Sequence, residues 1–126
     1  MSTMTMNRPK VDVKRLEVWV ADLGRQEGSV QGGIRPICIL QNDVGNKYAP
    51  TVAVAPMTTS KTKKKLPTHV NLKASEVGLE DDSILLVEQL GTINKERLMF
   101  KVAEIPESMA WLIDRACKIQ LGLTFN

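Results

Sequence analysis

Short apolar runs, separated by clusters of turn-forming residues, dominate this sequence and most limit the folds open to it. Each run is too short for a buried helix, and several are rich in β-branched residues, so the pattern predicts strands. The regular spacing of the runs, without long helical patterns between them, favours a compact, mainly β domain. The predicted strands are Glu17–Leu23, Ile34–Gln41, Thr51–Met57, Thr68–Leu72, Ser83–Gln89 and Leu98–Ile105.

The connections between these runs differ in length. Asn42–Asn46 is dense in turn formers and should reverse the chain. Residues 24–33 and 58–65 exceed hairpin length and have flexible compositions, so we expect functional loops there. A helical turn is predicted over Ala74–Val77, ending at Gly78, and another after Asn94, whose side chain can cap it.

The C-terminal segment has helical spacing. Pro106 suits a first helical position, and Met109, Leu112, Ile113, Ala116 and Gln120 then follow at intervals of three and four. The pattern predicts an amphipathic helix that ends near Gly122 and packs on the β core or on a partner subunit. The expected fold class is thus mainly β (α+β), with a C-terminal helix.

Composition places the chain among ordinary globular domains. Its 126 residues, 43% apolar and 25% charged, suffice for one domain, 15–126, after a polar N-terminal extension, 1–14. No apolar stretch reaches the roughly 20 residues of a membrane span, and the N-terminus lacks the apolar core of a secretory signal. Cys38 and Cys117 share no motif spacing, so we expect buried free thiols in a cytoplasmic protein.

Arg35 is the residue that most suggests chemistry. It stands where the glycine-rich loop, with Gly28, Gly32 and Gly33, enters the apolar run from Ile34. Glycines let a loop fold close to a ligand, and a guanidinium fixed at the start of a strand suits a phosphate. Arg35 is therefore a candidate to stabilise a phosphate in a fixed geometry.

Other polar residues are weaker candidates, and each has an ordinary structural alternative. Thr58 ends a strand, where its hydroxyl either bonds a phosphate oxygen beside Arg35 or simply completes a turn. Ser29 and Gln31 either hydrogen-bond a base or the reacting phosphate, or are ordinary loop residues. Glu88 interrupts an apolar strand. It either pairs with Arg35 or another basic residue, or accepts a proton, or simply lies on an exposed strand face, with Gln89 on the opposite face.

A local basic segment adds to this set. The net charge is only +3, which alone does not argue for nucleic acid. Four lysines, however, lie in one loop. This loop either attracts phosphates or is simply mobile and solvent-exposed. The lysines are Lys61, Lys63, Lys64 and Lys65.

Metal and cofactor motifs are missing from the sequence. It has no P-loop, dinucleotide fingerprint or metal-ligand spacing, and its single histidine, His69, is expected on a strand surface. RNA cleavage fits such a chain, because the RNA supplies the nucleophile, its 2′-OH. No cofactor and no metal are expected.

One long block, GSVQGGIRPICILQNDVGNKYAPTVAVAPMT, followed by KLPTHV, GLEDDSILLVEQ and TINKERL, resembles the PemK/MazF family of toxin ribonucleases. The resemblance runs from about Lys14 to Leu123. It implies a single SH3-like β-barrel with a C-terminal helix, a homodimer, and metal-independent cleavage of single-stranded RNA to a 2′,3′-cyclic phosphate and a 5′-OH. It also implies a cognate antitoxin that blocks the RNA groove.

The same resemblance assigns roles to individual positions. The catalytic arginine and threonine of the family fall on Arg35 and Thr58. An RNA-contacting or processing loop position falls on Ser29, and an acidic position used by some members, with its neighbouring glutamine, on Glu88 and Gln89. Gln31 and the four loop lysines are expected to bind RNA.

The chain departs from the family pattern at several positions. Leu16 replaces a glycine, Val30 an acid, Gly91 an arginine and Asn94 an aspartate. Two alternatives to RNA cleavage follow from the resemblance: a protein-binding toxin of the gyrase-poisoning kind, acting through its C-terminal residues, and a non-cleaving member that only binds antitoxin.

Overall fold

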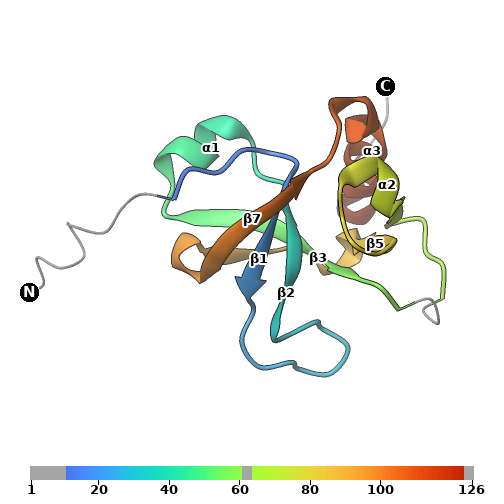
Figure 1. Cartoon of the computed structure of the whole chain (residues 1–126), viewed down its shortest axis with the longest axis horizontal. Helices are drawn as coiled ribbons and strands as arrows, with labels where there is room; N and C mark the ends of the chain where they lie inside the picture. Colours follow the sequence, from blue (N-terminus) through green and yellow to red (C-terminus); the bar gives the residue numbers. More distant parts are fainter. Residues whose placement is uncertain (1–10, 61–63, 124–126) are drawn as a thin grey trace, which may run out of the picture.

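The computed structural model describes residues 11–60 and 64–123 (Figure 1). It is built from short antiparallel strands, with helical turns between them and one longer helix at the C-terminal end. In chain order the elements are β1 (Glu17–Asp22), β2 (Ile34–Ile39), α1 (Asp43–Tyr48), β3 (Thr51–Thr58), β4 (His69–Leu72), α2 (Ala74–Val77), β5 (Ser83–Leu86), η2 (Val87–Gln89), β6 (Gly91–Asn94), η3 (Lys95–Arg97), β7 (Leu98–Glu104), η4 (Glu107–Met109) and α3 (Ala110–Leu121).

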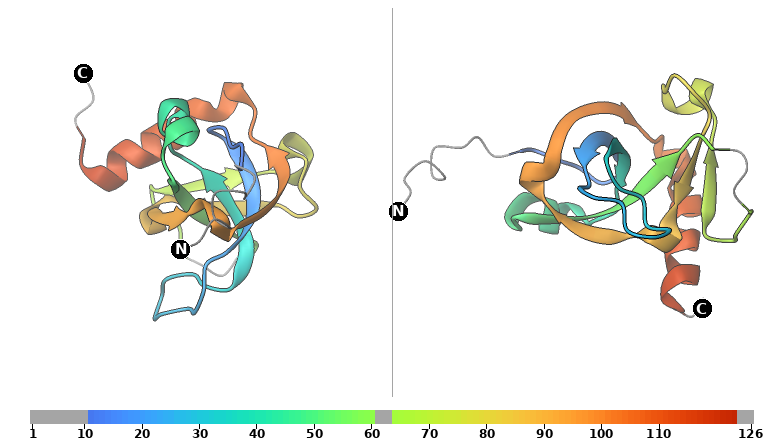
Figure 2. Two further views of the ribbon diagram at one scale, coloured as in Figure 1. Left: turned by 90° about the vertical axis from the view of Figure 1, so that its left-hand side faces the viewer. Right: turned by 90° about the horizontal axis from the view of Figure 1, so that it is seen from below.

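The strands form one sheet in the order β4-β5-β3-β2-β1-β7, with β6 also paired to β3. Strands β6 and β7 lie on opposite sides of β3-β2-β1, although only the three-residue turn η3 connects them. The sheet must therefore curl strongly, and the orange segment arches round β1 in Figure 2. The mainly β fold with a C-terminal helix is confirmed. The strand order has two open ends in the part of the chain described, so a closed barrel is not confirmed.

Strand β3 joins the two halves of the sheet. Its first residues, Thr51 to Val54, pair with β6, and its last two, Met57 and Thr58, pair with β5. Strand β2 pairs with β3 only from Ile37 to Ile39, whereas Ile34 to Pro36 pair with β1 alone. Pro36 lacks an N–H, and it stands where β2 has only one partner strand, as expected for an edge position.

The two faces of the curled sheet bury separate apolar clusters. Cys38 packs with Val18, Met57 and Ile113 against α3, while Ile37 and Ile39 join a second cluster on the other face. Burial of β2 on both faces is thus confirmed for Ile37–Ile39. Ile34, in contrast, is 62% exposed, because β3 no longer covers this part of the strand.

Ordered packing begins close to the N-terminal end of the described residues. Val13 is buried in the second cluster, inside the segment expected to be an extension. Leu16 is buried in the first cluster and has a φ of 76°. It is the only non-glycine residue of the described segments with a positive φ.

Several expected boundaries were wrong. Asn42–Asn46 does reverse the chain, but as the start of helix α1, with the Asn42 side chain accepting from the Gly45 N–H at 2.8 Å. The strand from Ser83 ends at Leu86, and Glu88 lies in the turn η2. Strand β6 was missed, and Asn94 caps η3 without a side-chain hydrogen bond.

The C-terminal helix and the cysteines largely match expectation. Helix α3 begins at Ala110, one turn later than predicted, since the 3₁₀ turn η4 follows Pro106. It ends at Gly122, whose φ of 68° suits glycine. Both cysteines are free thiols, as expected, but only Cys38 is buried, whereas Cys117 is half-buried. Within residues 11–60 and 64–123, no helix has the length and apolar character to span a membrane.

Candidate functional site

The glycine-rich loop between β1 and β2 folds back on itself. The Gly33 N–H donates to the Gly24 carbonyl at 2.6 Å, and the Gly24 N–H donates to Asp22 Oδ1 at 2.9 Å. A Cβ on Gly32 would lie 2.3 Å from the backbone nitrogen of Gln26, so only glycine fits there. The loop is therefore a compact structure that ends directly before Arg35.

Arg35 is held by this loop. Its Nε donates to the Gly32 carbonyl at 2.8 Å, and its Cα pairs with Ala21 of β1. One of the five N–H groups of the guanidinium is thus used to fix the side chain. The terminal nitrogens make no hydrogen bond within residues 11–60 and 64–123, so they are available to an anion.

Thr58 lies at the corresponding end of the neighbouring strand. Ile37 pairs with Pro56, so continuing the antiparallel register by two residues sets Arg35 opposite Thr58. The ladder itself stops at Ile37, while β3 continues to Thr58, paired with β5 along its other edge. The two side chains therefore stand at the diverging ends of β2 and β3. Thr58 Oγ1 accepts from the Ser60 N–H at 3.2 Å.

Glu88 does not pair with Arg35 in the structure but with residues at the start of β4. Its Oε2 lies 2.9 Å from His69 Nε2, and its Oε1 accepts from Thr68 Oγ1 at 3.1 Å. The His69 side chain is only 6% exposed, so its expected place on a strand surface was wrong. His69 Nδ1 accepts from the Leu66 N–H at 3.3 Å, which leaves the ring proton on Nε2, facing Glu88.

Gln89 bridges the turn η2 and the glycine-rich loop. Its Oε1 accepts from the Gln31 N–H at 2.8 Å, and its Nε2 donates to the Ser29 carbonyl at 3.0 Å. The side-chain amide of Gln89 thus makes two hydrogen bonds to the backbone of the loop, one as acceptor and one as donor. Ser29, Gln31 and Gln89, which the sequence could not relate to each other, meet here.

A pocket of about 440 Å³ opens between the loop and η2. It brings together four of the predicted site residues, Ser29, Lys64, Glu88 and Gln89, and its other lining residues are Val30, Leu66 and His69. Lys65 is exposed next to Lys64. Lys61 and Lys63 lie outside the described residues.

His69 and its partner Thr68 are the site residues that sequence reasoning missed. The motif LPTHV contains both, but nothing in its pattern indicates a contact with Glu88, which is 19 residues from His69. Only their position at the start of β4, beside β5 and η2, brings the three side chains together. The single histidine of the chain, two residues after Pro67, was the one available signal.

Cys38 is not a candidate nucleophile. It is fully buried, and burial raises the pKa of its thiol to about 12. Burial also raises the pKa of Cys117. In the described segments, no three His, Cys, Asp or Glu side chains form a group that could hold a metal ion.

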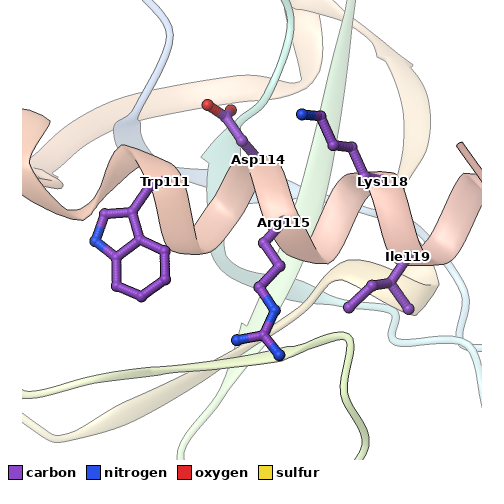
Figure 3. A pocket seen from close by; sticks show the side chains of 5 residues that line it. All are labelled: Trp111, Asp114, Arg115, Lys118 and Ile119. Carbon is purple, nitrogen blue, oxygen red and sulfur yellow. The ribbon is translucent and has the colours of Figure 1, made fainter. Parts of the chain in front are cut away.

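A larger hollow, about 580 Å³, lies on the outer face of α3 (Figure 3). Trp111, which is 60% exposed, lines it with Asp114, Arg115, Lys118 and Ile119. All five residues come from one helix, and none is a predicted site residue. We therefore assign the candidate site to the loop, β2, β3 and η2, and treat the α3 face as a separate surface.

Comparisons with known proteins find endoribonucleases among the similar chains. Endoribonuclease EndoA of Bacillus subtilis is 46% identical over 88% of this chain and 96% of its own length. Endoribonuclease MazF of Staphylococcus epidermidis is also 46% identical, over 88% of this chain and 92% of its own. A solved mycobacterial endoribonuclease in complex with its cognate antitoxin has a TM-score of 0.75 at 23% identity, covering 90% of this chain and 99% of that one.

A family model covers nearly the whole domain as well. Residues 14–121 match the model of the PemK-like, MazF-like toxin of type II toxin–antitoxin systems. The match spans the glycine-rich loop, Arg35, Thr58 and the turn with Glu88 and Gln89. This chain belongs to the PemK-like, MazF-like toxin family.

Proposed function

We propose that this protein is a sequence-selective endoribonuclease toxin that cleaves single-stranded RNA and is inhibited by a cognate antitoxin. The carrying observation is the position of Arg35 and Thr58 at the diverging ends of two adjacent strands, in a chain 46% identical to two endoribonucleases. Arg35 is fixed through one N–H, which leaves its other donors for a phosphate.

The reaction needs only the RNA and these side chains. The 2′-oxygen attacks the adjacent phosphorus, a new O2′–P bond forms, and the P–O5′ bond breaks. The 2′-OH proton passes to a base, and a proton is delivered to the leaving 5′-oxygen, so the products are a 2′,3′-cyclic phosphate and a 5′-OH. Arg35 stabilises the negative charge of the pentavalent phosphorane, and Thr58 positions the phosphate by hydrogen bonding. No metal or cofactor takes part.

Other residues hold the RNA strand. Ser29 and Gln89 line the pocket beside the loop, and Gln31 lies next to them, with its N–H bonded to Gln89. Glu88 contributes a carboxylate as a further RNA-contacting or catalytic group. Lys64 and Lys65 attract the phosphate backbone, together with Lys61 and Lys63 of the same loop.

The proposed function includes a homodimer and a complex with the antitoxin. The active form is a cytoplasmic homodimer, for which the exposed apolar side chains Trp111, Leu121 and Leu123 offer contact surface. Light scattering on the purified protein should then give a mass near twice 14.0 kDa. The antitoxin competes with RNA for the groove, so adding it should stop cleavage.

Replacing Arg35 tests the mechanism. Arg35→Ala removes a charged donor from the transition state, and the cleavage rate should fall by about 10²–10³-fold. Arg35→Lys keeps the charge but loses the planar fork, and an intermediate rate is expected. Cleavage of a long defined RNA in EDTA, with the product ends mapped, measures rate, metal independence and end chemistry together.

The thermal unfolding temperature of each variant controls for folding. Arg35 lies where β2 has only one partner strand, so both variants should fold. A folded Arg35→Ala protein that cuts RNA as fast as wild type would exclude this mechanism.

A further inference from the structure

The pocket beside η2 contains one carboxylate, Glu88, together with the apolar side chains of Val30 and Leu66. We propose that it binds a single unstacked nucleobase of the RNA, and that Glu88, held by His69 and Thr68, selects a base with an amino group over uracil. This inference rests on the proposed function and adds a base preference to it. His69 is a positioning residue in this scheme, since it acts through Glu88.

The hydrogen bonds define Glu88 as an acceptor. The Leu66 N–H occupies His69 Nδ1, so the Nε2–H must donate to Glu88 Oε2. The Thr68 hydroxyl donates to the other oxygen. Both carboxylate oxygens thus face a donor from β4 or the turn before it, so Glu88 is used here as a hydrogen-bond acceptor.

The same bonds leave room for a ligand. A carboxylate offers about four lone-pair sites, of which Thr68 and His69 use two. The Glu88 side chain is 23% exposed, and it lines the pocket. The carboxylate can therefore accept further N–H groups from an incoming molecule without losing its supports.

This acceptor discriminates between bases. Cytosine, adenine and guanine each present an amino group, and guanine adds the neighbouring N1–H. Uracil presents a single N–H between two carbonyl oxygens, which a carboxylate repels. Carboxylates accordingly accept from the cytosine amino group in known protein–nucleic acid contacts.

The walls of the pocket suit a flat base. Val30 is 58% and Leu66 41% exposed, so both offer apolar surface at its mouth. Its volume of about 440 Å³ lies within the range of small-ligand sites. Proteins that read single-stranded RNA bind splayed bases by such packing combined with hydrogen bonds to the base edge. Lys64 at the same pocket supplies a cation for the attached phosphate.

Binding of non-cleavable RNA tests the preference. The probes are 2′-O-methyl heptamers, all uridine or with a central cytidine, adenosine or guanosine, and the measurement is fluorescence anisotropy. Wild type should bind the three substituted heptamers about 5- to 150-fold more tightly than the all-uridine one. Glu88→Gln should lose most of this difference. A carboxamide can also donate a hydrogen bond to a uracil carbonyl oxygen, so the pocket would bind uracil as well.

Two substitutions of His69 test its positioning role. The amide nitrogen of glutamine reaches the place of Nε2, whereas that of asparagine reaches only the place of Nδ1. His69→Gln should therefore keep the base preference, and His69→Asn should lose it. Glu76→Gln, which neutralises an exposed carboxylate on α2, is the charge control and should keep the preference.

Cleavage of a long RNA separates the possible failures. If wild type cuts the long RNA but binds all heptamers equally or not at all, the base pocket is wrong and the proposed function stands. If wild type neither cuts nor binds RNA, the proposed function itself fails. A preference unchanged in Glu88→Gln excludes Glu88 as the selecting group, and equal behaviour of the two His69 variants excludes the positioning role.

Discussion

Leu16 illustrates how a single residue can be both strained and important for packing. Its φ of 76° lies in the left-handed region, which costs a residue with a Cβ roughly 1–2 kcal/mol. The backbone is fixed there, since the Leu16 N–H donates to Ile39 and its carbonyl accepts from the Ile105 N–H, both at 2.9 Å. The buried side chain offsets this strain by filling the cluster under α3.

Two substitutions separate these opposing contributions. Leu16→Ala should destabilise the protein by about 2–5 kcal/mol, because it empties a core position and keeps the strain. Leu16→Gly loses the same side chain but removes the strain, so we expect it to be more stable than Leu16→Ala by about 1 kcal/mol. Urea unfolding gives both free energies.

Val18 serves as the matched position. It is fully buried in β1 and has no positive φ, so there alanine should be more stable than glycine, the usual order. If Leu16→Ala proves more stable than Leu16→Gly, the backbone at Leu16 is not strained in solution.

At the level of elements, the glycine-rich loop depends on one close backbone approach. A Cβ at position 32 would lie 2.3 Å from the Gln26 nitrogen, so Gly32→Ala must displace the loop. The Gly32 carbonyl then moves away from Arg35 Nε, and cleavage should fall at least about tenfold, since a misplacement of about 1 Å costs up to 10²-fold. The unfolding temperature should change little, because the loop lies outside the core.

Gly28 provides the control for this loop. It has a φ of 57°, but a Cβ there would meet nothing within 4 Å. Gly28→Ala therefore adds local strain without a clash, and its cleavage rate should stay well above that of Gly32→Ala. Equal losses in the two variants would mean that general loop stiffness, not the position of the Gly32 carbonyl, limits activity.

Strand β1 is tied to β7 by the buried carboxylate of Glu17. Burial by itself raises the pKa of Glu17, but hydrogen bonds from Trp19 Nε1, the Lys14 N–H and Lys101 outweigh it, so the pKa is lowered below 4.5. A lowered folded-state pKa means that the stabilisation is present above 4.5 and is lost as the pH falls through the folded-state value.

Glu17→Gln should therefore be less stable than wild type near neutral pH, by about 1–3 kcal/mol, because it loses a charged acceptor. The difference should narrow as the pH falls below 4.5. Urea unfolding across the acid range measures it. Glu104→Gln, which removes the exposed second partner of Lys101, should have a much smaller effect, and a difference for Glu17 that does not depend on pH would contradict the assignment.

Elements whose signal lies in the local sequence were predicted correctly, and those that depend on contacts between distant segments were not. Strands β1, β2, β3 and β7 follow from local apolar runs, and Gly78 and Gly122 mark helix ends by their own backbone preference. Strand β6 has only one intermediate position among exposed ones, so its apolar pattern is too weak to detect. The pairing of Glu88 with His69 depends on β4 packing beside β5, which no local pattern contains.

At the scale of the whole molecule, the curled sheet separates two regions of surface. Helix α1 lies at one end, while residues 64–68 before β4 and helix α3 lie at the other (Figures 1 and 2). The net charge is only +3, so any attraction of RNA must come from where the charges sit. Lys64 lines the pocket beside the glycine-rich loop, at the same end of the sheet as Thr58.

This charge distribution predicts that the salt dependence of RNA binding comes from the lysines beside the pocket. For single strands, log K falls with log salt by about 0.7 for each neutralised phosphate. Replacing Lys64 and Lys65 by glutamine should therefore flatten the slope by about 1.4, whereas the same change at Lys14 and Lys47, near α1, should leave it unaltered. Titrations of one 2′-O-methyl oligonucleotide at several salt concentrations measure both slopes. Equal slopes for the two double variants would show that RNA does not follow the lysine loop, even if cleavage at Arg35 persists.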